Sequence, residues 1–337
     1  MTSEDMIKTE LNLVQFDLTD ECPLLCRHCS NSSGPHVKSG LLHKTVERAI
    51  LDAINLGCRN FVFSGGEPLC YVDLPRLLSA CHEYRVSPAI FTTGIRDKSA
   101  RLPLSDEDWG KLKALGLGKA IFSLYSGPAN RTFHNHVVRL RPLGMRDAFE
   151  ANEVGILRAR DAGISVEVQF VPSDETCSEL GAIASWAIEI GVSQLHLQYP
   201  TSQGRNEISQ SLMVTNRYEP TLRAQALSLS QENGSKLHIS RLWRSKWGIP
   251  SETALSAQII IRSDGFAVRC NACKYIVESA SEMNIYQNSV QQIWGDANWR
   301  NALCECSTQR VRKTVAASGR SSLQIVRAHD LLAPGTE

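Results

Sequence analysis

The stretch LNLVQFDLTDECPLLCRHCSNSSG, residues 11–34, joins an apolar, β-rich run directly to a loop that is dense in cysteine. From Leu11 to Leu18 apolar residues largely alternate with polar ones, which is typical of a β-strand. Pro23 follows in the loop and disfavours a regular helix there, because it has no amide hydrogen. The stretch therefore predicts a strand whose end leads into a loop that can wrap around a ligand.

Further short apolar runs follow this strand, separated by stretches with helical periodicity. The predicted strands are Leu11–Leu18, Asn60–Ser64, Ser87–Thr92, Lys119–Leu124, Ser165–Val171 and Gln194–Tyr199. The predicted helices are His43–Leu56, Asp73–Tyr84, Asp106–Leu115, Arg146–Ala162 and Cys177–Ile190. This alternation predicts an α/β fold with six parallel strands, either as an open doubly wound sheet or as an incomplete barrel, and we expect the second, a partial (β/α)6 barrel. In both arrangements ligands bind where loops leave the carboxyl ends of the strands.

The alternation stops near residue 200, which divides the chain into four predicted parts. Residues 1–200 form the barrel, 201–256 a linker with a polar helix, 257–310 a small cysteine-rich domain, and 311–337 a tail. The small domain opens with two β-rich runs around Ser263, Asp264 and Gly265, a pattern typical of a hairpin.

Composition excludes several classes of protein. The chain has 337 residues, a formal net charge of +1 and 42% hydrophobic residues, so it is neither disordered nor broadly basic enough to favour nucleic acid. The apolar run from Ala182 is broken by Glu189 and is shorter than the roughly 20 residues of a membrane helix. Eleven cysteines without a signal peptide predict reduced thiols. We expect a cytoplasmic protein without nucleic-acid or membrane partners.

The cysteine loop carries the densest chemical signal. Cys22, Cys26 and Cys29 are separated by three and then two residues. Because three thiolates on a [4Fe-4S] cluster leave one iron open to another ligand, the odd count favours a reactive site over a closed one. Two alternatives remain: three structural thiols, or a zinc site completed by His28.

A glycine pair marks the end of the second predicted strand. Gly65, Gly66, Glu67 and Pro68 follow the apolar run at the edge where a barrel builds its site. Adjacent glycines permit close approaches of the backbone, which suits a loop that presents carbonyls and amides to a small ligand. Glu67 adds an acceptor for a charged amine.

Together, Cys-x3-Cys-x2-Cys after the first strand and GGEP after the second resemble the motifs of radical S-adenosylmethionine (radical SAM) enzymes. The resemblance implies that the three cysteines hold a [4Fe-4S] cluster whose fourth iron binds the amino and carboxylate groups of S-adenosylmethionine. It also implies that GGEP binds the amino group of the methionine moiety. His28 takes the place of the family's usual aromatic near the adenine, and Ser123 ends a strand from which the family contacts ribose or carboxylate.

A second set of cysteines lies near the other end of the chain. CNAC provides Cys270 and Cys273, and CEC provides Cys304 and Cys306. Four thiolates suit either an iron-sulfur cluster or a structural zinc ion, and the spacing does not separate the two. The order hairpin, CNAC, CEC resembles the SPASM or twitch extension of radical SAM enzymes, which implies an auxiliary [4Fe-4S] cluster.

The resemblance implies an enzyme that forms a 5′-deoxyadenosyl radical and abstracts hydrogen from a ribosomally synthesised peptide, giving a cross-link, a thioether or an epimerised centre. The alternatives are the same chemistry on a nucleotide or aminosugar, or a non-catalytic zinc or iron-sulfur protein. We expect an external one-electron reductant of the flavodoxin or ferredoxin type. Because the first strand starts near Leu11, a peptide substrate would be recognised by a separate leader-binding protein or directly.

Four other residues are of interest. Cys70 follows GGEPL and is a candidate hydrogen donor or extra ligand, although a structural role is favoured. His134 and His136 are expected in a solvated loop, and Arg205 on the surface. No residue is assigned a catalytic role.

Overall fold

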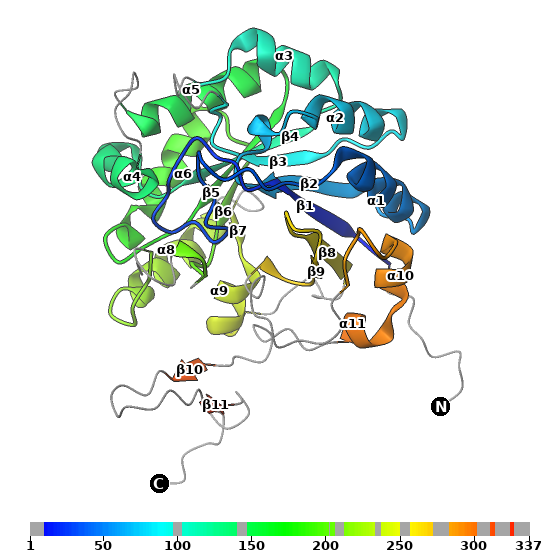
Figure 1. Cartoon of the computed structure of the whole chain (residues 1–337). Helices are drawn as coiled ribbons and strands as arrows, with labels where there is room; N and C mark the ends of the chain where they lie inside the picture. Colours follow the sequence, from blue (N-terminus) through cyan, green and yellow to red (C-terminus); the bar gives the residue numbers. More distant parts are fainter. Residues whose placement is uncertain are drawn as a thin grey trace.

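The computed structural model describes residues 10–96, 103–139, 147–201, 203–205, 212–232, 237–249, 257–271, 283–301, 311–313 and 324–326. Its centre is a sheet with the strand order β7-β6-β5-β4-β3-β2-β1-β8-β9. Every pair from β7 to β8 is parallel, and only the last pair, β8 with β9, is antiparallel. Figure 1 shows the helices around this sheet. The predicted α/β class with parallel strands is confirmed.

The strands are β1 Leu13–Thr19, β2 Asn60–Gly65, β3 Ala89–Thr92, β4 Lys119–Leu124, β5 Ser165–Phe170, β6 Gln194–Leu197, β7 Leu237–Ile239, β8 Gln258–Ile261 and β9 Ala267–Val268. Two further short strands, β10 Val311–Lys313 and β11 Gln324–Val326, pair with each other. The α-helices are α1 His43–Asn55, α2 Leu74–Glu83, α3 Asp106–Ala114, α4 Arg131–Val138, α5 Ala148–Asp161, α6 Leu180–Glu189, α8 Glu219–Glu232, α9 Arg241–Lys246, α10 Val290–Gly295 and α11 Ala297–Asn301. Short 3-10 turns lie at Pro68–Cys70, Pro128–Asn130 and Cys177–Glu179.

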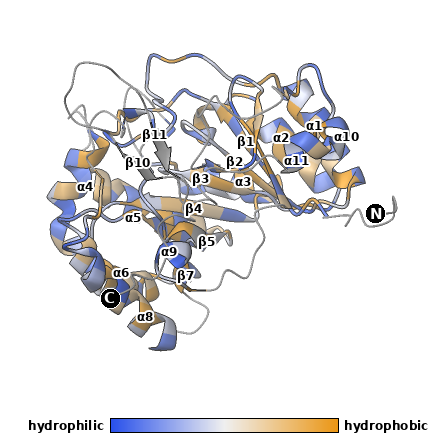
Figure 2. Cartoon of the chain, turned by 90° about the horizontal axis from the view of Figure 1, so that it is seen from below, coloured by the Kyte–Doolittle hydropathy of each residue, from blue (hydrophilic) through white to orange (hydrophobic). Residues whose placement is uncertain are grey.

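Side-chain alternation gives the sheet two different faces. In β1 the side chains of Val14, Phe16 and Leu18 are fully buried in the main hydrophobic core together with residues of the helices. Successive side chains of a strand point to opposite faces, so Gln15 and Asp17 lie on the other, inner face. Figure 2 shows hydrophobic residues concentrated along the strands. The outer face is thus the hydrophobic core, and polar groups are left to the inner face.

The sheet extends beyond the six strands that the sequence predicts. Strand β7 comes from the range assigned to the linker, and β8 comes from the range assigned to the small domain and pairs in parallel with β1. The hairpin of β8 and β9 forms as predicted, with Gly265 at a φ of +89°. The division of the chain into domains stays a prediction.

One local prediction is wrong. His134 and His136 lie in helix α4 and not in a loop, and His134 is buried. The helix forms because His134, Val137 and Val138 share one buried face, and this three- and four-residue spacing is helical. No helix in the described part of the chain is long and apolar enough to cross a membrane.

Candidate functional site

The cysteine loop begins where β1 ends and is fixed by backbone hydrogen bonds. The N–H of Cys22 donates to the carbonyl of Gly34 (3.2 Å), and the N–H of Arg27 donates to Val137 (2.9 Å). The Sγ of Cys29 accepts from the N–H of Ser33 (3.3 Å). The loop is therefore held at both ends and also against helix α4.

Burial and the neighbouring cysteines affect the ionisation of two thiols of the loop. Burial, and then the neighbouring Cys26, raise the pKa of Cys22 well above its ordinary value. Burial, and then Cys29, raise the pKa of Cys26 to about 12. Thiols that resist ionisation, as Cys22 and Cys26 do, suit a cationic metal centre, because its charge compensates the thiolates. Thiolates are the ligands that a [4Fe-4S] cluster takes, but among the described residues these side chains are not drawn together as a ready-made metal site, so their role as ligands stays a prediction.

The glycine pair packs directly beneath this loop. The N–H of Gly66 donates to the carbonyl of Thr19 (2.5 Å), and the N–H of Glu67 donates to that of Glu21 (2.8 Å). A Cβ atom on Gly66 would collide with the carbonyl oxygen of Glu21, and one on Gly65 with that of Thr19. The glycines are thus required for backbone packing, and the N–H groups of Gly66 and Glu67 are both used within the chain. Among the described residues the carbonyl of Gly66 accepts no hydrogen bond.

Glu67 joins the ends of β2 and β3. Its fully buried carboxylate accepts hydrogen bonds from the Thr92 hydroxyl (2.7 Å), from the hydroxyl (2.6 Å) and N–H (2.7 Å) of Thr93, and from the N–H of Leu69 (3.2 Å). Burial raises its pKa, although these four donors act in the opposite direction. Because both oxygens already have partners, amine binding by this side chain stays a prediction. Pro68 opens the following turn.

A row of aromatic rings runs away from the loop. The His28 ring lies 4.1 Å from that of Tyr125, which lies 5.4 Å from that of His134. Burial, and then His134, lower the pKa of His28 to about 3, and burial lowers that of His134 to about 4. Both imidazoles are therefore neutral at physiological pH. Ser123, whose adenosine-binding role stays a prediction, hydrogen bonds to Tyr125.

Sequence reasoning missed the role of Arg205. Arg205 was expected to be a satisfied arginine at the surface; it is partly buried, and its guanidinium donates to the carbonyls of Cys26 (2.7 Å) and Ser33 (2.6 Å) in the cysteine loop. A lone arginine in a loop after a strand carries no signal for such a contact.

Sequence reasoning also missed a row of polar side chains that contact one another across the inner face of β4–β7. The Lys119 ammonium contacts one oxygen of Glu167 (2.5 Å), and His196 Nε2 contacts the other (2.7 Å). His196 Nδ1 lies 3.2 Å from His238 Nδ1. The hydrogen bonds of His196 and Lys119 lower the pKa of Glu167 although burial opposes them. The available signal was the place of Lys119, Glu167 and His196 at inward positions of predicted strands.

The second cysteine set is only partly described. Cys270 is buried just after β9, whereas Cys273, Cys304 and Cys306 lie outside the described residues. Near the first site, the thiol of Cys70 donates to the carbonyl of Arg96 (3.3 Å).

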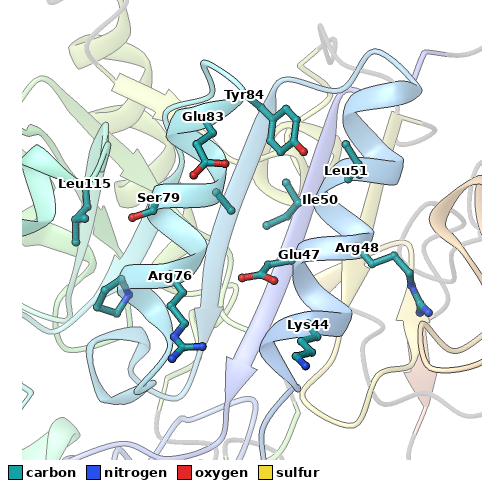
Figure 3. Close-up of a pocket in the computed structure, with 12 residues that line it drawn as sticks. Lys44, Glu47, Arg48, Ile50, Leu51, Arg76, Ser79, Glu83, Tyr84 and Leu115 are labelled. Atoms are coloured by element: carbon teal, nitrogen blue, oxygen red, sulfur yellow. The ribbon is translucent and has the colours of Figure 1, made fainter.

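A groove of about 680 Å³ lies on the outer side of the molecule. Figure 3 shows that charged side chains of α1 and α2, including Glu47 and Arg76, line it. It lies away from the cysteine loop and takes no part in the site.

Comparisons with known proteins find relatives in one superfamily. A model of the Radical SAM superfamily matches residues 17–185, half of the chain. The chain is 29% identical to the PqqA peptide cyclase of Ruegeria pomeroyi, over 54% of this chain and 45% of that protein. It is 26% identical to the Fe-coproporphyrin III synthase of Methanosarcina barkeri, over 68% of this chain and 53% of that protein. It thus spans about half the length of these curated relatives.

Solved structures share the fold. Streptococcus suis SuiB bound to precursor peptide SuiA aligns with a TM-score of 0.64 at 16% identity, covering 87% of this chain and 66% of that one. The anSMEcpe protein with bound AdoMet aligns with a TM-score of 0.63 at 17% identity, covering 86% of this chain and 78% of that one. The superfamily uses a [4Fe-4S] cluster and S-adenosylmethionine. With the family model matching half of its length, the chain belongs to the radical SAM superfamily.

Proposed function

We propose that this radical SAM enzyme cleaves S-adenosylmethionine at the loop of Cys22, Cys26 and Cys29 and then abstracts hydrogen from a peptide. The observation that carries the proposal is the loop of three cysteines, which is hydrogen bonded through Glu21 to the Gly-Gly-Glu-Pro turn at the carboxyl ends of β1 and β2. When bound there, the [4Fe-4S] cluster supplies the electron that splits the sulfonium and yields a 5′-deoxyadenosyl radical.

The residues of the chain bind and orient the cosubstrate. We propose that the carbonyl of Gly66, which no described residue uses, accepts a hydrogen bond from the methionine amine. The neutral ring of His28 offers a flat surface for the adenine, backed by Tyr125. Burial of Cys22 and of Glu67 limits water at the site.

A peptide substrate is supported by relatives and neighbours. The matched cyclase is named for the PqqA peptide, and the SuiB structure holds a precursor peptide. We also propose that Cys270, Cys273, Cys304 and Cys306 hold an auxiliary cluster.

A second candidate is the same chemistry on a small molecule. Relatives include probable GTP 3′,8-cyclases, 27% identical in Sulfurisphaera tokodaii over 57% of this chain and 58% of that protein. The polar inner face of β4–β7 suits a polar ligand.

The first test replaces each cysteine of the loop by alanine in anaerobically reconstituted protein. We expect each variant to lose 5′-deoxyadenosine formation, whereas Cys70→Ala, at the same edge of the sheet, retains it. Iron should fall from about eight to about four per chain, because one of two four-iron clusters is lost. Retained cleavage in all three variants would refute the proposal.

The substrate class is tested by offering deuterated peptides and deuterated nucleotides to the reconstituted enzyme. Deuterium transfer into 5′-deoxyadenosine from a peptide supports the first candidate. Transfer from a nucleotide alone supports the second.

A further inference from the structure

The segment Gln203–Arg205 lies against the cysteine loop, although 179 positions separate Arg205 from Cys26. The Arg205 guanidinium donates to the carbonyls of Cys26 (2.7 Å) and Ser33 (2.6 Å). Its backbone N–H donates to the carbonyl of Cys29 (3.0 Å). A planar guanidinium fixes the directions of its donors, so its two bonds, together with the backbone bond, hold the loop at three points between Cys26 and Ser33.

Gly204 makes the close approach possible. Its φ is +55°, in the left-handed region, and a Cβ atom would collide with the carbonyl oxygens of Cys29 and Ser30. Glycine is therefore required both for the backbone conformation and for the space.

The other end of the segment reaches the second cysteine motif. The amide of buried Gln203 donates to the carbonyl of Asn271 (3.1 Å), which follows Cys270 directly. The Asn271 side chain pairs with Gln15 of β1 through two hydrogen bonds of 3.2 and 3.0 Å. A second connection returns to the first loop, because Gln15 and Asn31 both donate to the carboxylate of buried Asp17.

We propose that Gln203–Arg205 is a positioning clamp that holds the loop of Cys22, Cys26 and Cys29 in its ligand-binding shape and joins it to the second cysteine motif at Asn271. That this shape serves to bind a cluster rests on the proposed function. The clamp itself is a property of the polypeptide, and metal-free protein is sufficient to test it.

The test measures alkylation of each cysteine by iodoacetamide in the metal-free, full-length chain, read by mass spectrometry. Arg205→Lys keeps the charge but loses the planar guanidinium, whose two N–H groups reach two carbonyls at once. We expect alkylation of Cys26 and Cys29 to rise about fivefold, the change for one ordinary hydrogen bond. The matched control is Arg59→Lys, since Arg59 also donates to two backbone carbonyls, those of Ile54 (3.1 Å) and Cys58 (2.9 Å), but away from the loop.

A second pair of variants separates contact from backbone strain. Gly204→Ala adds a Cβ at a positive φ that meets the loop, whereas Gly248→Ala adds one at a φ of +68° with no atom within 4 Å. We expect only Gly204→Ala to expose Cys26 and Cys29. Cys58 and Cys81, both fully buried in the core, are internal controls for global unfolding.

Several outcomes would overturn the clamp. Wild-type alkylation rates in both Arg205→Lys and Gly204→Ala would do so, and so would a parallel rise at Cys58 and Cys81. Gln203→Leu should raise alkylation of Cys270, and an unchanged rate would refute the connection to the second motif.

Reconstituted protein gives an independent readout. We expect Arg205→Lys to lose iron to a chelator faster than wild-type protein or Arg59→Lys, and equal rates would contradict a positioning role. If the wild-type chain holds no iron under any condition, the proposed function fails, while the alkylation pattern still decides the clamp.

Discussion

The carboxyl ends of β1–β3 and the inner face of β4–β7 are two polar regions of one sheet, built in opposite ways. At β1–β3 the contacts involve the backbone: the N–H of Gly66 donates to Thr19 at the end of β1, the N–H of Glu67 donates to Glu21 in the cysteine loop, and the Glu67 carboxylate accepts from the backbone and side chain of Thr93. At β4–β7 the contacts are between side chains, from Lys119 through Glu167 to His196 and His238. Backbone packing requires particular residues at fixed spacing and is therefore visible in the sequence as a motif. A row of contacts between side chains requires only one polar residue per strand and leaves no such motif.

The largest effect is expected from Gly66→Ala, which breaks the backbone region. The new Cβ meets the carbonyl of Glu21 and must displace the cysteine loop. We expect a loss of about 3 kcal/mol in the free energy of unfolding, the upper end for overpacking, together with loss of S-adenosylmethionine cleavage. Urea unfolding and 5′-deoxyadenosine formation measure the two effects.

The matched control is Gly110→Ala in helix α3, where a Cβ meets no atom within 4 Å. It should be neutral or slightly stabilising, because alanine favours a helix. Equal behaviour of the two variants would contradict the packing role of Gly66.

Glu67→Gln tests the carboxylate that joins β2 to β3. Glutamine keeps the shape but replaces a charged acceptor of four hydrogen bonds with a neutral amide. We expect a loss of about 1.5 to 3 kcal/mol in unfolding free energy, the range for hydrogen bonds to charged groups. Exposed Glu83→Gln on α2 should change stability little. If Glu67→Gln is equally silent, the joining role is refuted.

His134→Phe tests the aromatic row through pH. The native pKa of His134, about 4, lies below its ordinary value of 6.5, so the unfolded chain binds the extra proton between these values. Stability therefore falls as the pH drops from about 6.5 to about 4, by up to about 1.4 kcal/mol per pH unit for this group.

Phenylalanine removes the titrating group but keeps a ring beside Tyr125 and Phe149. We expect thermal unfolding across this pH range to show a shallower loss in His134→Phe than in wild type. His36→Gln, at an exposed position, should leave the wild-type slope. An unchanged slope in His134→Phe would show that His134 does not remain neutral.

The smallest effect is expected from Glu167→Gln in the side-chain region. Its partner Lys119 is 39% exposed, so solvent screening limits the loss to about 1 kcal/mol at neutral pH. Because the pKa of Glu167 is lowered, its contribution is present above the ordinary carboxyl pKa and disappears as the pH falls through the native value. The unfolding free energies of Glu167→Gln and wild type should thus converge at acid pH, whereas those of Gly66→Ala and wild type should stay apart. Cleavage of S-adenosylmethionine should persist in Glu167→Gln. A loss of cleavage would contradict the separation of the two regions.

Much of the fold was predictable from local pattern. Strand β4 has the predicted bounds Lys119–Leu124, and α1 differs from its prediction by one residue at its end. Strand β7 was missed because Leu237–Ile239 has only three residues, too few to show a period. Helix α4 was missed because two histidines two positions apart do not reveal which of them is buried.

The sequence by itself determined the family and the position of the cysteine loop, since Cys-x3-Cys-x2-Cys and GGEP are local patterns with local backbone requirements. Only the tertiary structure decided what meets that loop. Arg205 and Gly204 reach it from beyond β6, and β8 pairs with β1 across more than half of the chain. Such contacts arise from the way the strands associate, and a polar residue far along the chain carries no local mark of the partner that it will find.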